Sequence, residues 1–370
     1  MQHLISWFNL KSVPGIGNLL FKRLLDRFST PQQVFEASRE DLLAVEGISR
    51  KITAAIAGQR RTGHRFEAEL DAIANSDCRI LTCKDAEYPR LLHQIPDPPP
   101  YLYVRGRLEP TRPAVAVVGS RNGTRYGKAI ALRLGAELAA GRLTVVSGMA
   151  LGIDTCAHEG ALQAGGFTVA VMGTGLNHIY PAQNRKLHDA IAERGAVVSE
   201  LPLDAGPDAR HFPARNRIIS GVALGTLVVE ATLKSGSLIT ARLAAEQNRE
   251  VFAIPGSIDS FKSTGTHALI KQGAKLVENV QDILEELPAG SYQPKAVVRH
   301  MRPEISTPLG ELSALDRKIL AALDRYPVHI DKLVRKLDLE PGELAAALLQ
   351  LELKGAVHQD RGSLFSRKTR

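Results

Sequence analysis

The segment from about residue 70 to residue 286 alternates short apolar runs with longer helix-like stretches. The first clear run, Ala114 to Gly119 (AVAVVG), is almost continuously apolar, as expected of a strand that is buried on both faces of a parallel sheet. Similar runs follow as LTVVSG, FTVAVMG, AVVSE, GTLVVEA and REVFAIPG. Six or seven such units predict an α/β fold, a doubly wound parallel sheet with right-handed crossovers. Ligands of such sheets bind beyond the carboxyl ends of the strands, so the turns there are the places to look for function.

The charge balance and the cysteine content narrow the classes of function. Lys and Arg number 47 against 39 Asp and Glu, and the resulting net charge of +8 permits a polyanionic partner. Cys78, Cys83 and Cys156 are too few for a disulfide framework and lack the spacing of metal ligands, which fits a reducing cytoplasm. The N-terminus lacks the pattern of a secretion signal, and no stretch reaches about 18 uninterrupted apolar residues. We therefore expect a cytoplasmic protein without a membrane span.

The chain divides by pattern into four regions. Residues 1–66 indicate a small all-α domain, and residues 67–286 form the predicted α/β core. Residues 287–312 are rich in proline and polar side chains and are expected to be a linker, after which residues 313–370 return to helical periodicity.

The N-terminal region contains a weak internal repeat. VPGIG begins at Val13 and VEGIS begins at Val45, and a helix-like run follows each. Such turns are typical of helix-hairpin-helix or SAM-like domains, in which amide groups at a helix N-terminus face a phosphate. Ser49 stands where the first copy has Gly17, which weakens the motif, so a docking domain whose glycines form tight turns is favoured over direct DNA contact.

The C-terminal region predicts three amphipathic helices followed by a β-wing, which is the order of a winged-helix domain. The third helix, which reads DNA in many such domains, holds Glu340, Glu343 and Glu352 against only Lys354. An acidic face does not suit phosphate, so contact with a protein partner or a regulatory role is at least as well supported as DNA binding.

Small, polar and cationic residues gather at the predicted carboxyl ends of the strands. The turn after the first strand, Gly119-Ser120-Arg121, is not a G-x-G-x-x-G motif, and its guanidinium suits an external phosphate. Amide donors, arginines and an exposed ring are what single-stranded nucleic acid requires, since bases stack on rings and phosphates meet charge. The candidate DNA-binding residues are Gly119, Ser120, Arg121, Phe212, Arg215, Asn216, Arg217, Ser235, Gly236 and Ser237. A small anionic ligand would use the same helix N-termini, and ordinary β-α turns would show the same glycines.

Acid–base chemistry is the competing interpretation of the polar residues. Asp154 and His158 are spaced to share a helix face, and Glu200 and Glu230 end strands, so they could act on a nucleotide. Structural roles are favoured: Asp154 as a helix N-cap, His158 in local packing and Glu230 beside an arginine. The sequence carries no metal-ligand cluster, nucleophile elbow or Walker P-loop, so we predict no catalytic residue, no metal and no cofactor.

Several longer segments resemble the DNA processing protein A (DprA/Smf) family. They include VAVVGSRNGTRYG, VVSGMALGIDTCAHEGAL, VAVMGTGLNHIYPAQN, SELPL, FPARNRIISG and LVVEATLKSGSLITARLA, and the resemblance extends from about Tyr88 to Val280. It implies an extended Rossmann-like core, flanked in many members by a helical N-terminal domain and a winged-helix C-terminal domain. It also implies a non-enzymatic protein that binds and protects single-stranded DNA during natural transformation, helps to load the RecA recombinase and forms a homodimer through the core.

The resemblance carries DNA-binding positions over to this chain at Ser120, Arg121, Phe212, Arg215 and Arg217. Many members have a basic residue where this chain has Leu151, which removes one expected phosphate contact; Arg185 and Lys186 are alternative sources of charge.

A phosphoribohydrolase-like enzyme that processes nucleotides is the alternative function. Such enzymes favour a Pro-Gly-Gly-x-Gly-Thr turn beside a catalytic carboxylate. Here the comparable strand end reads Val229-Glu230-Ala231-Thr232, without that run of glycines.

Overall fold

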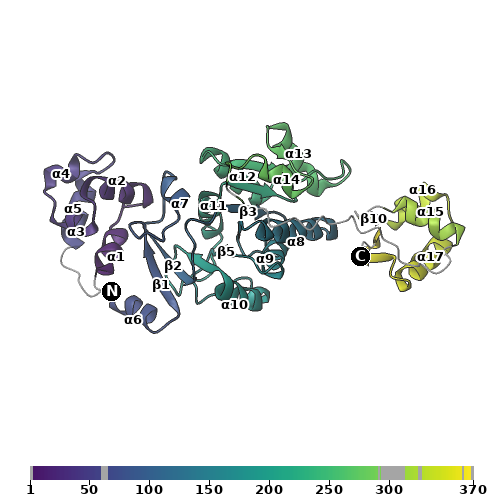
Figure 1. The fold of residues 1–370 in the computed structure, drawn as a ribbon, viewed down its shortest axis with the longest axis horizontal. Helices are drawn as coiled ribbons and strands as arrows, with labels where there is room; N and C mark the ends of the chain where they lie inside the picture. Colours follow the sequence, from purple (N-terminus) through teal and green to yellow (C-terminus); the bar gives the residue numbers. More distant parts are fainter. Residues whose placement is uncertain are drawn as a thin grey trace.

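The structure is a computed structural model that describes residues 3–59, 66–290, 292, 313–323, 327–360 and 362–367. Figure 1 shows a helical N-terminal part, a central part built on a sheet and a C-terminal part with its own small sheet. Most of the predicted linker, 287–312, lies outside the described residues. Within the described ranges, none of the helices combines the length and the apolar character needed to cross a membrane.

A nine-stranded sheet forms the centre of the molecule, in the order β1-β2-β6-β5-β4-β3-β7-β8-β9. The strands are β1 (Cys78–Thr82), β2 (Tyr101–Gly106), β3 (Ala114–Val118), β4 (Thr144–Ser147), β5 (Thr168–Val171), β6 (Ala196–Ser199), β7 (Gly225–Val228), β8 (Glu250–Ala253) and β9 (Lys275–Leu276). From β6 to β9 every neighbouring pair is parallel, which confirms the predicted Rossmann-like core. The sheet is not wholly parallel, however, because β1 and β2 add an antiparallel pair at the β6 edge.

Helices cover both faces of this sheet. They are α7 (Arg90–Gln94), α8 (Arg125–Ala140), α9 (Ile153–Gln163), α10 (Arg185–Arg194), α11 (His211–Gly221), α12 (Gly236–Glu246), α13 (Thr264–Lys271) and α14 (Val280–Leu284), with short 3-10 turns at Ala182–Asn184 and Phe261–Ser263. Along β3, Val115 and Val117 belong to the core cluster under α8 and α9, whereas Ala116 and Val118 belong to the cluster under α11 and α12. This two-residue alternation explains why the strand is apolar throughout.

Helices α8 and α9 approach each other at glycines. A Cβ atom added to Gly160 would lie 2.0 Å from the carbonyl oxygen of Leu132, so a side chain there would force the helices apart. This close packing sets the position of the first turn of α9, which is part of the candidate site described below.

The order in which successive strands are added to the sheet reverses at β3. Strands β4, β5 and β6 extend to one side of it, and β7, β8 and β9 extend to the other. In open α/β sheets a crevice forms at such a reversal, outside the carboxyl ends of the strands. The topology therefore directs attention to the turns that follow β3, β4 and β7.

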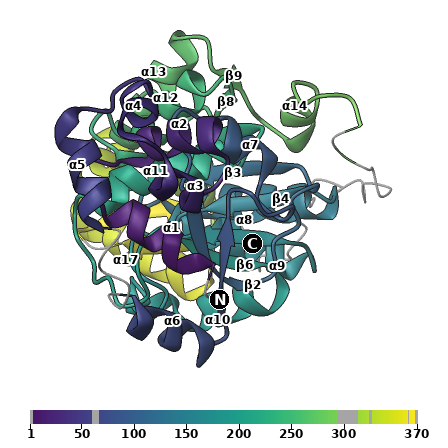
Figure 2. The same cartoon turned by 90° about the vertical axis from the view of Figure 1, so that its left-hand side faces the viewer.

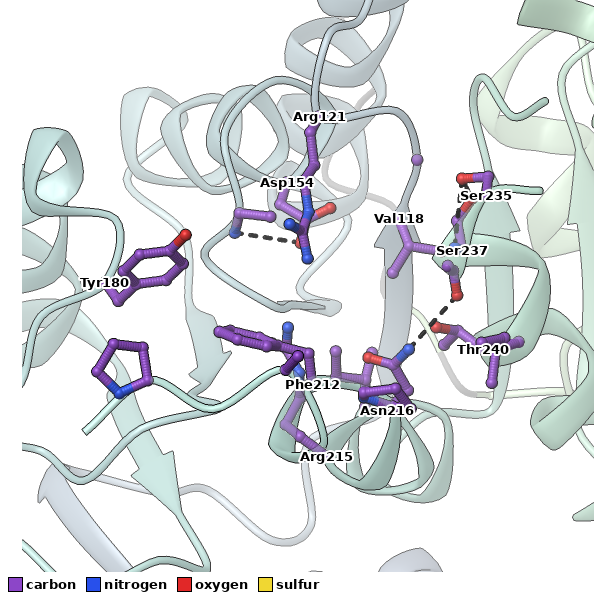
Figure 3. A pocket seen from close by; sticks show the side chains of 18 residues that line it. Val118, Arg121, Asp154, Tyr180, Phe212, Arg215, Asn216, Ser235, Ser237 and Thr240 are labelled. Atoms are coloured by element: carbon purple, nitrogen blue, oxygen red, sulfur yellow. Dashed lines mark hydrogen bonds between the residues drawn. The ribbon is translucent and has the colours of Figure 1, made fainter. Parts of the chain in front are cut away.

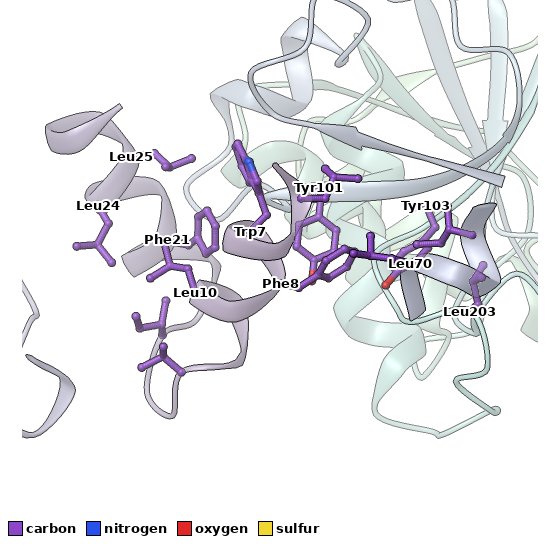
Figure 4. Close-up of a cluster of buried hydrophobic side chains, with 14 of the residues drawn as sticks. Trp7, Phe8, Leu10, Phe21, Leu24, Leu25, Leu70, Tyr101, Tyr103 and Leu203 are labelled. Carbon is purple, nitrogen blue, oxygen red and sulfur yellow. The ribbon is translucent and has the colours of Figure 1, made fainter. Parts of the chain in front are cut away.

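The N-terminal part shares a hydrophobic core with the sheet. Its helices are α1 (Leu4–Ser12), α2 (Asn18–Phe28), α3 (Pro31–Glu36), α4 (Arg39–Leu43), α5 (Arg50–Gln59) and α6 (Glu67–Ala74). Trp7 stacks on Phe21 with 5.7 Å between ring centres, and Phe8 meets the edge of Tyr101 of β2 at 4.9 Å (Figure 4). Figure 2 shows α1 in front of the strands when the molecule is viewed from the N-terminal side. Docking of this part on the core is thus an observed property of the fold.

The C-terminal part has the helix and strand order of a winged helix, as predicted. It comprises α15 (Ala314–Ala322), β10 (Val328–His329), α16 (Ile330–Leu337), α17 (Pro341–Leu353), β11 (Val357–Asp360) and β12 (Leu364–Arg367). Its sheet runs in the order β10-β12-β11, and Leu333, Leu348 and Phe365 are among its buried core residues. Leu349 on α17 is 58% exposed, so the helix that reads DNA in many winged helices presents an apolar side chain to solvent.

Candidate nucleic-acid interface

A cavity of about 700 Å³ lies at the carboxyl ends of the central strands. Figure 3 shows the turn after β3, the first turn of α11 and the start of α12 around it. Eight of the predicted site residues line it, namely Gly119, Arg121, Phe212, Arg215, Asn216, Ser235, Gly236 and Ser237. The fold thus brings together residues that are more than one hundred positions apart in the chain.

The turn after β3 presents Arg121 to solvent. The guanidinium carbon of Arg121 lies 5.6 Å from the centre of the Phe212 ring, which is a cation–π geometry. Thr124 caps α8 by accepting a hydrogen bond from the amide of Gly127 at 3.0 Å. Both carboxylate oxygens of Glu230 accept hydrogen bonds from Thr124, one from its amide at 2.8 Å and one from its hydroxyl. Glu230, which is 2% exposed, therefore fixes this turn and pairs with none of the described arginines.

The turn after β4 is held by a buried carboxylate. Oδ2 of Asp154 accepts hydrogen bonds from the amides of Gly148 at 3.1 Å and Ala150 at 3.3 Å. The expectation that Asp154 is the N-cap is wrong: the cap position of α9 is Gly152, and Asp154 lies within the first turn. Burial raises the pKa of Asp154, while the charge of Arg215 acts in the opposite direction.

Arg215 is a buried cation at the base of the cavity. Its side chain donates from Nη1 to the carbonyl oxygen of Val171, and its Nε finds no hydrogen-bond partner among the described residues. Burial lowers the pKa of Arg215 to about 10, so the group stays charged at neutral pH. A Cβ atom at Gly148 would lie 2.1 Å from Nη1, so the glycine is what leaves room for the guanidinium. The cavity therefore has a fixed positive charge beneath it.

Two aromatic rings stand at the rim. Tyr180 is 44% exposed, and its ring centre lies 5.6 Å from that of Phe212 with the ring planes tilted by 48°. The sequence prediction included Phe212 and missed Tyr180. The missed signal was an aromatic residue in the loop after a predicted strand end, within the segment NHIYPAQN. Together the two rings and Arg121 offer flat surfaces on which bases can stack.

The start of α12 supplies hydroxyl and amide groups. Ser235 caps the helix by accepting from the amide of Ser237 at 3.4 Å, and Asn216 donates to the carbonyl oxygen of Gly236 at 3.4 Å. Space around Gly236 is open, since a Cβ atom there would meet nothing within 4 Å. An anion in this space would face the positive end of the α12 dipole.

The structure does not bring Arg217 or Ser120 to the cavity wall. Residues two apart on a helix point about 200° apart, so Arg217 projects from the side of α11 opposite Arg215. Arg217 is 8% exposed and pairs with Glu200 and with Asp97, so the structure places it outside the cavity, and its role as a DNA contact stays a prediction. The hydroxyl of Ser120 instead accepts from the amide of Asn122 at 3.2 Å within its own turn.

The charges around the cavity favour an anionic ligand. Among the residues that line it, Asp154 is the one carboxylate, against the guanidinium groups of Arg121 and Arg215. Leu151 is 39% exposed. Arg185 and Lys186 are exposed at the start of α10.

The remaining acid–base candidates have structural roles. His158 is fully buried, and its Nδ1 lies 2.7 Å from the hydroxyl of Thr168, which donates to the carbonyl oxygen of Val145. Burial, assisted by the charge of Arg215, lowers the pKa of His158 to about 3, so the ring is neutral. No group of three or more potential metal ligands occurs within the part of the chain that the structure describes.

Comparisons with known proteins identify the family of the chain. Residues 79–288 match the family model of DNA recombination-mediator protein A, residues 303–363 match the DprA winged helix domain, and residues 9–57 match a SAM-like helix-hairpin-helix tandem. Protein Smf of Synechocystis is 37% identical over 391 residues, which cover 98% of each chain. DNA processing protein DprA of Streptococcus pneumoniae is 48% identical over 200 residues, covering 54% of this chain and 71% of the relative.

Two solved structures share the fold. DNA processing protein A from Streptococcus pneumoniae superimposes with a TM-score of 0.68 at 38% identity, covering 78% of this chain and 98% of the other. DNA processing protein A from Helicobacter pylori, whose structure is described for its mode of single-stranded DNA binding, gives a TM-score of 0.52 at 33% identity. That match covers 57% of this chain and 98% of the other.

Proposed function

The chain belongs to the DNA recombination-mediator protein A family, and from this premise we propose that it binds single-stranded DNA in the cavity beyond β3. Family membership gives the protein a role in DNA processing and recombination. The finer proposal is that it holds and protects incoming single strands during natural transformation and helps to load the RecA recombinase in the cytoplasm.

One observation carries the proposal: two guanidinium groups and two rim aromatics surround a cavity that has a single carboxylate in its lining. In this arrangement a phosphate would meet Arg121 at the surface and the helix dipole of α12 below. Unpaired bases would stack on Phe212 and Tyr180, without any requirement for sequence.

We propose binding without turnover, and the carboxylates support this choice over a phosphoribohydrolase-like reaction. A general base must be able to reach a substrate proton. Both oxygens of Glu230 are occupied by Thr124, and Asp154 holds two amides of its own loop. Glu230 does not line the cavity, and the backbone engages Oδ2 of Asp154, which does line it.

The Arg121→Gln variant is expected to bind an oligo-dT strand about tenfold more weakly, because one charge-assisted phosphate contact is lost. Each phosphate neutralised on a single strand contributes about 0.7 to the slope of log affinity against log salt concentration. The magnitude of this negative slope should therefore fall by about 0.7 in this variant, as measured by fluorescence anisotropy over a salt series.

Arg107→Gln is the matched control for this measurement. Arg107 is exposed and directly follows Gly106, which pairs with Ala196 at the opposite end of the sheet. Its removal changes the net charge equally and should leave the slope unchanged. Equal slopes for the wild type and the Arg121→Gln variant would contradict a phosphate contact at Arg121.

We also propose a homodimer formed through the α/β core. The β9 edge of the sheet and the segment between β8 and α13 expose three large apolar side chains: Ile258 at 91%, Phe261 at 69% and Leu276 at 41%. Exposed apolar side chains beside an open sheet edge are typical of a surface that pairs with another chain. Light scattering on the full-length protein should give twice the monomer mass of 40.1 kDa, and a monomer mass would refute the dimer.

We also propose exact residue limits for the four regions of the chain. We propose a helical domain at 1–66, the core at 67–286, a linker at 287–312 and the winged-helix domain at 313–370.

A further inference from the structure

Helix α11 carries functional candidates on two opposite faces, one toward the cavity and one away from it. One face turns Phe212, Arg215 and Asn216 to the cavity. The opposite face carries Arg217, which is 8% exposed and lies outside the cavity. Whatever fixes Arg217 also fixes the side chains on the cavity face, because a helix of 11 residues moves as a unit.

Arg217 is held between two carboxylates. Its Nη2 donates to Oε2 of Glu200, and its Nε lies 3.1 Å from Oδ2 of Asp97. Glu200 directly follows β6, and Asp97 lies between α7 and β2. Removal of one partner of such a buried pair leaves the other charge without compensation, which is costly. The orientation of α11 is therefore tied to the β6 end of the sheet.

The same Glu200 carboxylate also receives the N-terminal part of the chain. Nδ2 of Asn18, the first residue of α2, donates to Oε2 of Glu200 at 3.2 Å. Oδ1 of Asn18 in turn accepts from Nζ of Lys11 in α1. Burial lowers the pKa of Lys11, and the charge of Glu200 opposes this effect.

The contact between Asn18 and Glu200 lies next to the VPGIG turn, which the sequence analysis considered as a phosphate-binding hairpin. The turn begun by Val13 leads directly into α2, and the first side chain of α2 faces Glu200 of the core. An acidic group of the core thus contacts the first side chain of α2 at this hairpin. The first hairpin acts as a docking element in this chain.

We propose that Lys11, Asn18, Glu200 and Arg217 form a clamp through which the N-terminal domain holds α11, and with it Phe212 and Arg215, in the orientation that binds DNA. Arg217 is then a positioning residue and makes no phosphate contact. The inference rests on the proposed binding of single-stranded DNA in the cavity. It gives the N-terminal domain a part in that binding without any contact with the strand.

The slope of affinity against salt separates positioning from contact. Lys11→Met and Glu200→Gln are each expected to weaken oligo-dT binding about 5- to 10-fold, because α11 loses a restraint. Neither variant should change the slope, since no phosphate contact is removed, whereas Arg121→Gln should lower its magnitude by about 0.7. Loss of a positive charge at Lys11 and loss of a negative charge at Glu200 should both weaken oligo-dT binding. A purely electrostatic effect on the DNA would instead weaken binding in Lys11→Met and strengthen it in Glu200→Gln.

Arg39→Met is the matched control, because Arg39 is exposed on α4 of the same domain. It should bind as the wild type does. Lys11→Met combined with Arg217→Gln should lose less affinity than the sum of the two single effects, as expected of residues in one network. Glu200→Gln nearly preserves the shape of the side chain and serves as the test if Arg217→Gln does not fold.

Wild-type affinity in both Lys11→Met and Glu200→Gln would overturn the clamp. A slope lowered in magnitude by about 0.7 in Arg217→Gln would overturn it as well, because Arg217 would then contact a phosphate. Absence of oligo-dT binding by the wild-type protein would refute the proposed function itself, so the two failures are distinguishable.

Discussion

Replacement of Phe212 by alanine is expected to weaken the binding of a short oligo-dT strand by about 5- to 150-fold, the equivalent of about 1–3 kcal/mol for one lost base stack. Phe212 is the ring on which the site converges, since Arg121 and Tyr180 each lie 5.6 Å from its centre. Its removal eliminates one stacking surface and releases the other two groups. Fluorescence anisotropy with a labelled strand measures the effect.

Phe212→Trp provides the control, because it keeps a ring that stacks well on any base. It should retain most of the affinity that Phe212→Ala loses. Equal affinity of Phe212→Ala and the wild type would show that bases do not stack at this rim.

Replacement of Arg215 by methionine is expected to lower the free energy of unfolding by about 3–5 kcal/mol, in addition to weakening DNA binding. The reason is that Asp154, which is 6% exposed, would be left as a buried charge without a counter-charge. Urea denaturation monitored by circular dichroism gives the change.

Arg121→Met is the control for Arg215→Met, because Arg121 is exposed whereas Arg215 is buried. Arg121→Met removes the same charge from the same cavity and should change the free energy of unfolding by no more than about 0.5 kcal/mol. Stability of Arg215→Met within that range would mean that the charge of Arg215 does not support the base of the cavity.

The parallel core could be predicted because its strands are buried on both faces and are therefore apolar throughout, as β3 is. The antiparallel pair was harder. β1 reads CRILT and β2 reads YLYVRG, and both carry an arginine and lie near an edge, so neither shows the same continuous run.

The sequence predicted which residues line the cavity better than it predicted how their side chains are oriented. Strand-end turns identified Gly119, Arg121 and the start of α12, because the carboxyl ends of parallel strands meet at one edge. Arg217 does not line the cavity, and helical phase could have separated it from Arg215. Its partner Glu200 could not be predicted, since the pairing depends on how a helix packs against a distant strand.

The docking of the N-terminal domain was also beyond local reasoning. Asn18 and Glu200 are 182 residues apart in the chain, and a hairpin turn has the same sequence whether a phosphate or a carboxylate faces it. The choice between the two interpretations of the VPGIG turn required the tertiary structure.

The central claim is that single-stranded DNA lies in the cavity against Phe212 and Tyr180. Ultraviolet cross-linking of an oligonucleotide that carries 5-iodouridine, followed by mass spectrometry of the peptides, tests it most directly, because this base cross-links efficiently to aromatic rings on which it stacks. We predict cross-links at Phe212, Tyr180 or both, lost with Phe212→Ala and Tyr180→Ala together. Cross-links found only in α17 of the winged helix, or only in the N-terminal helices, would contradict the account.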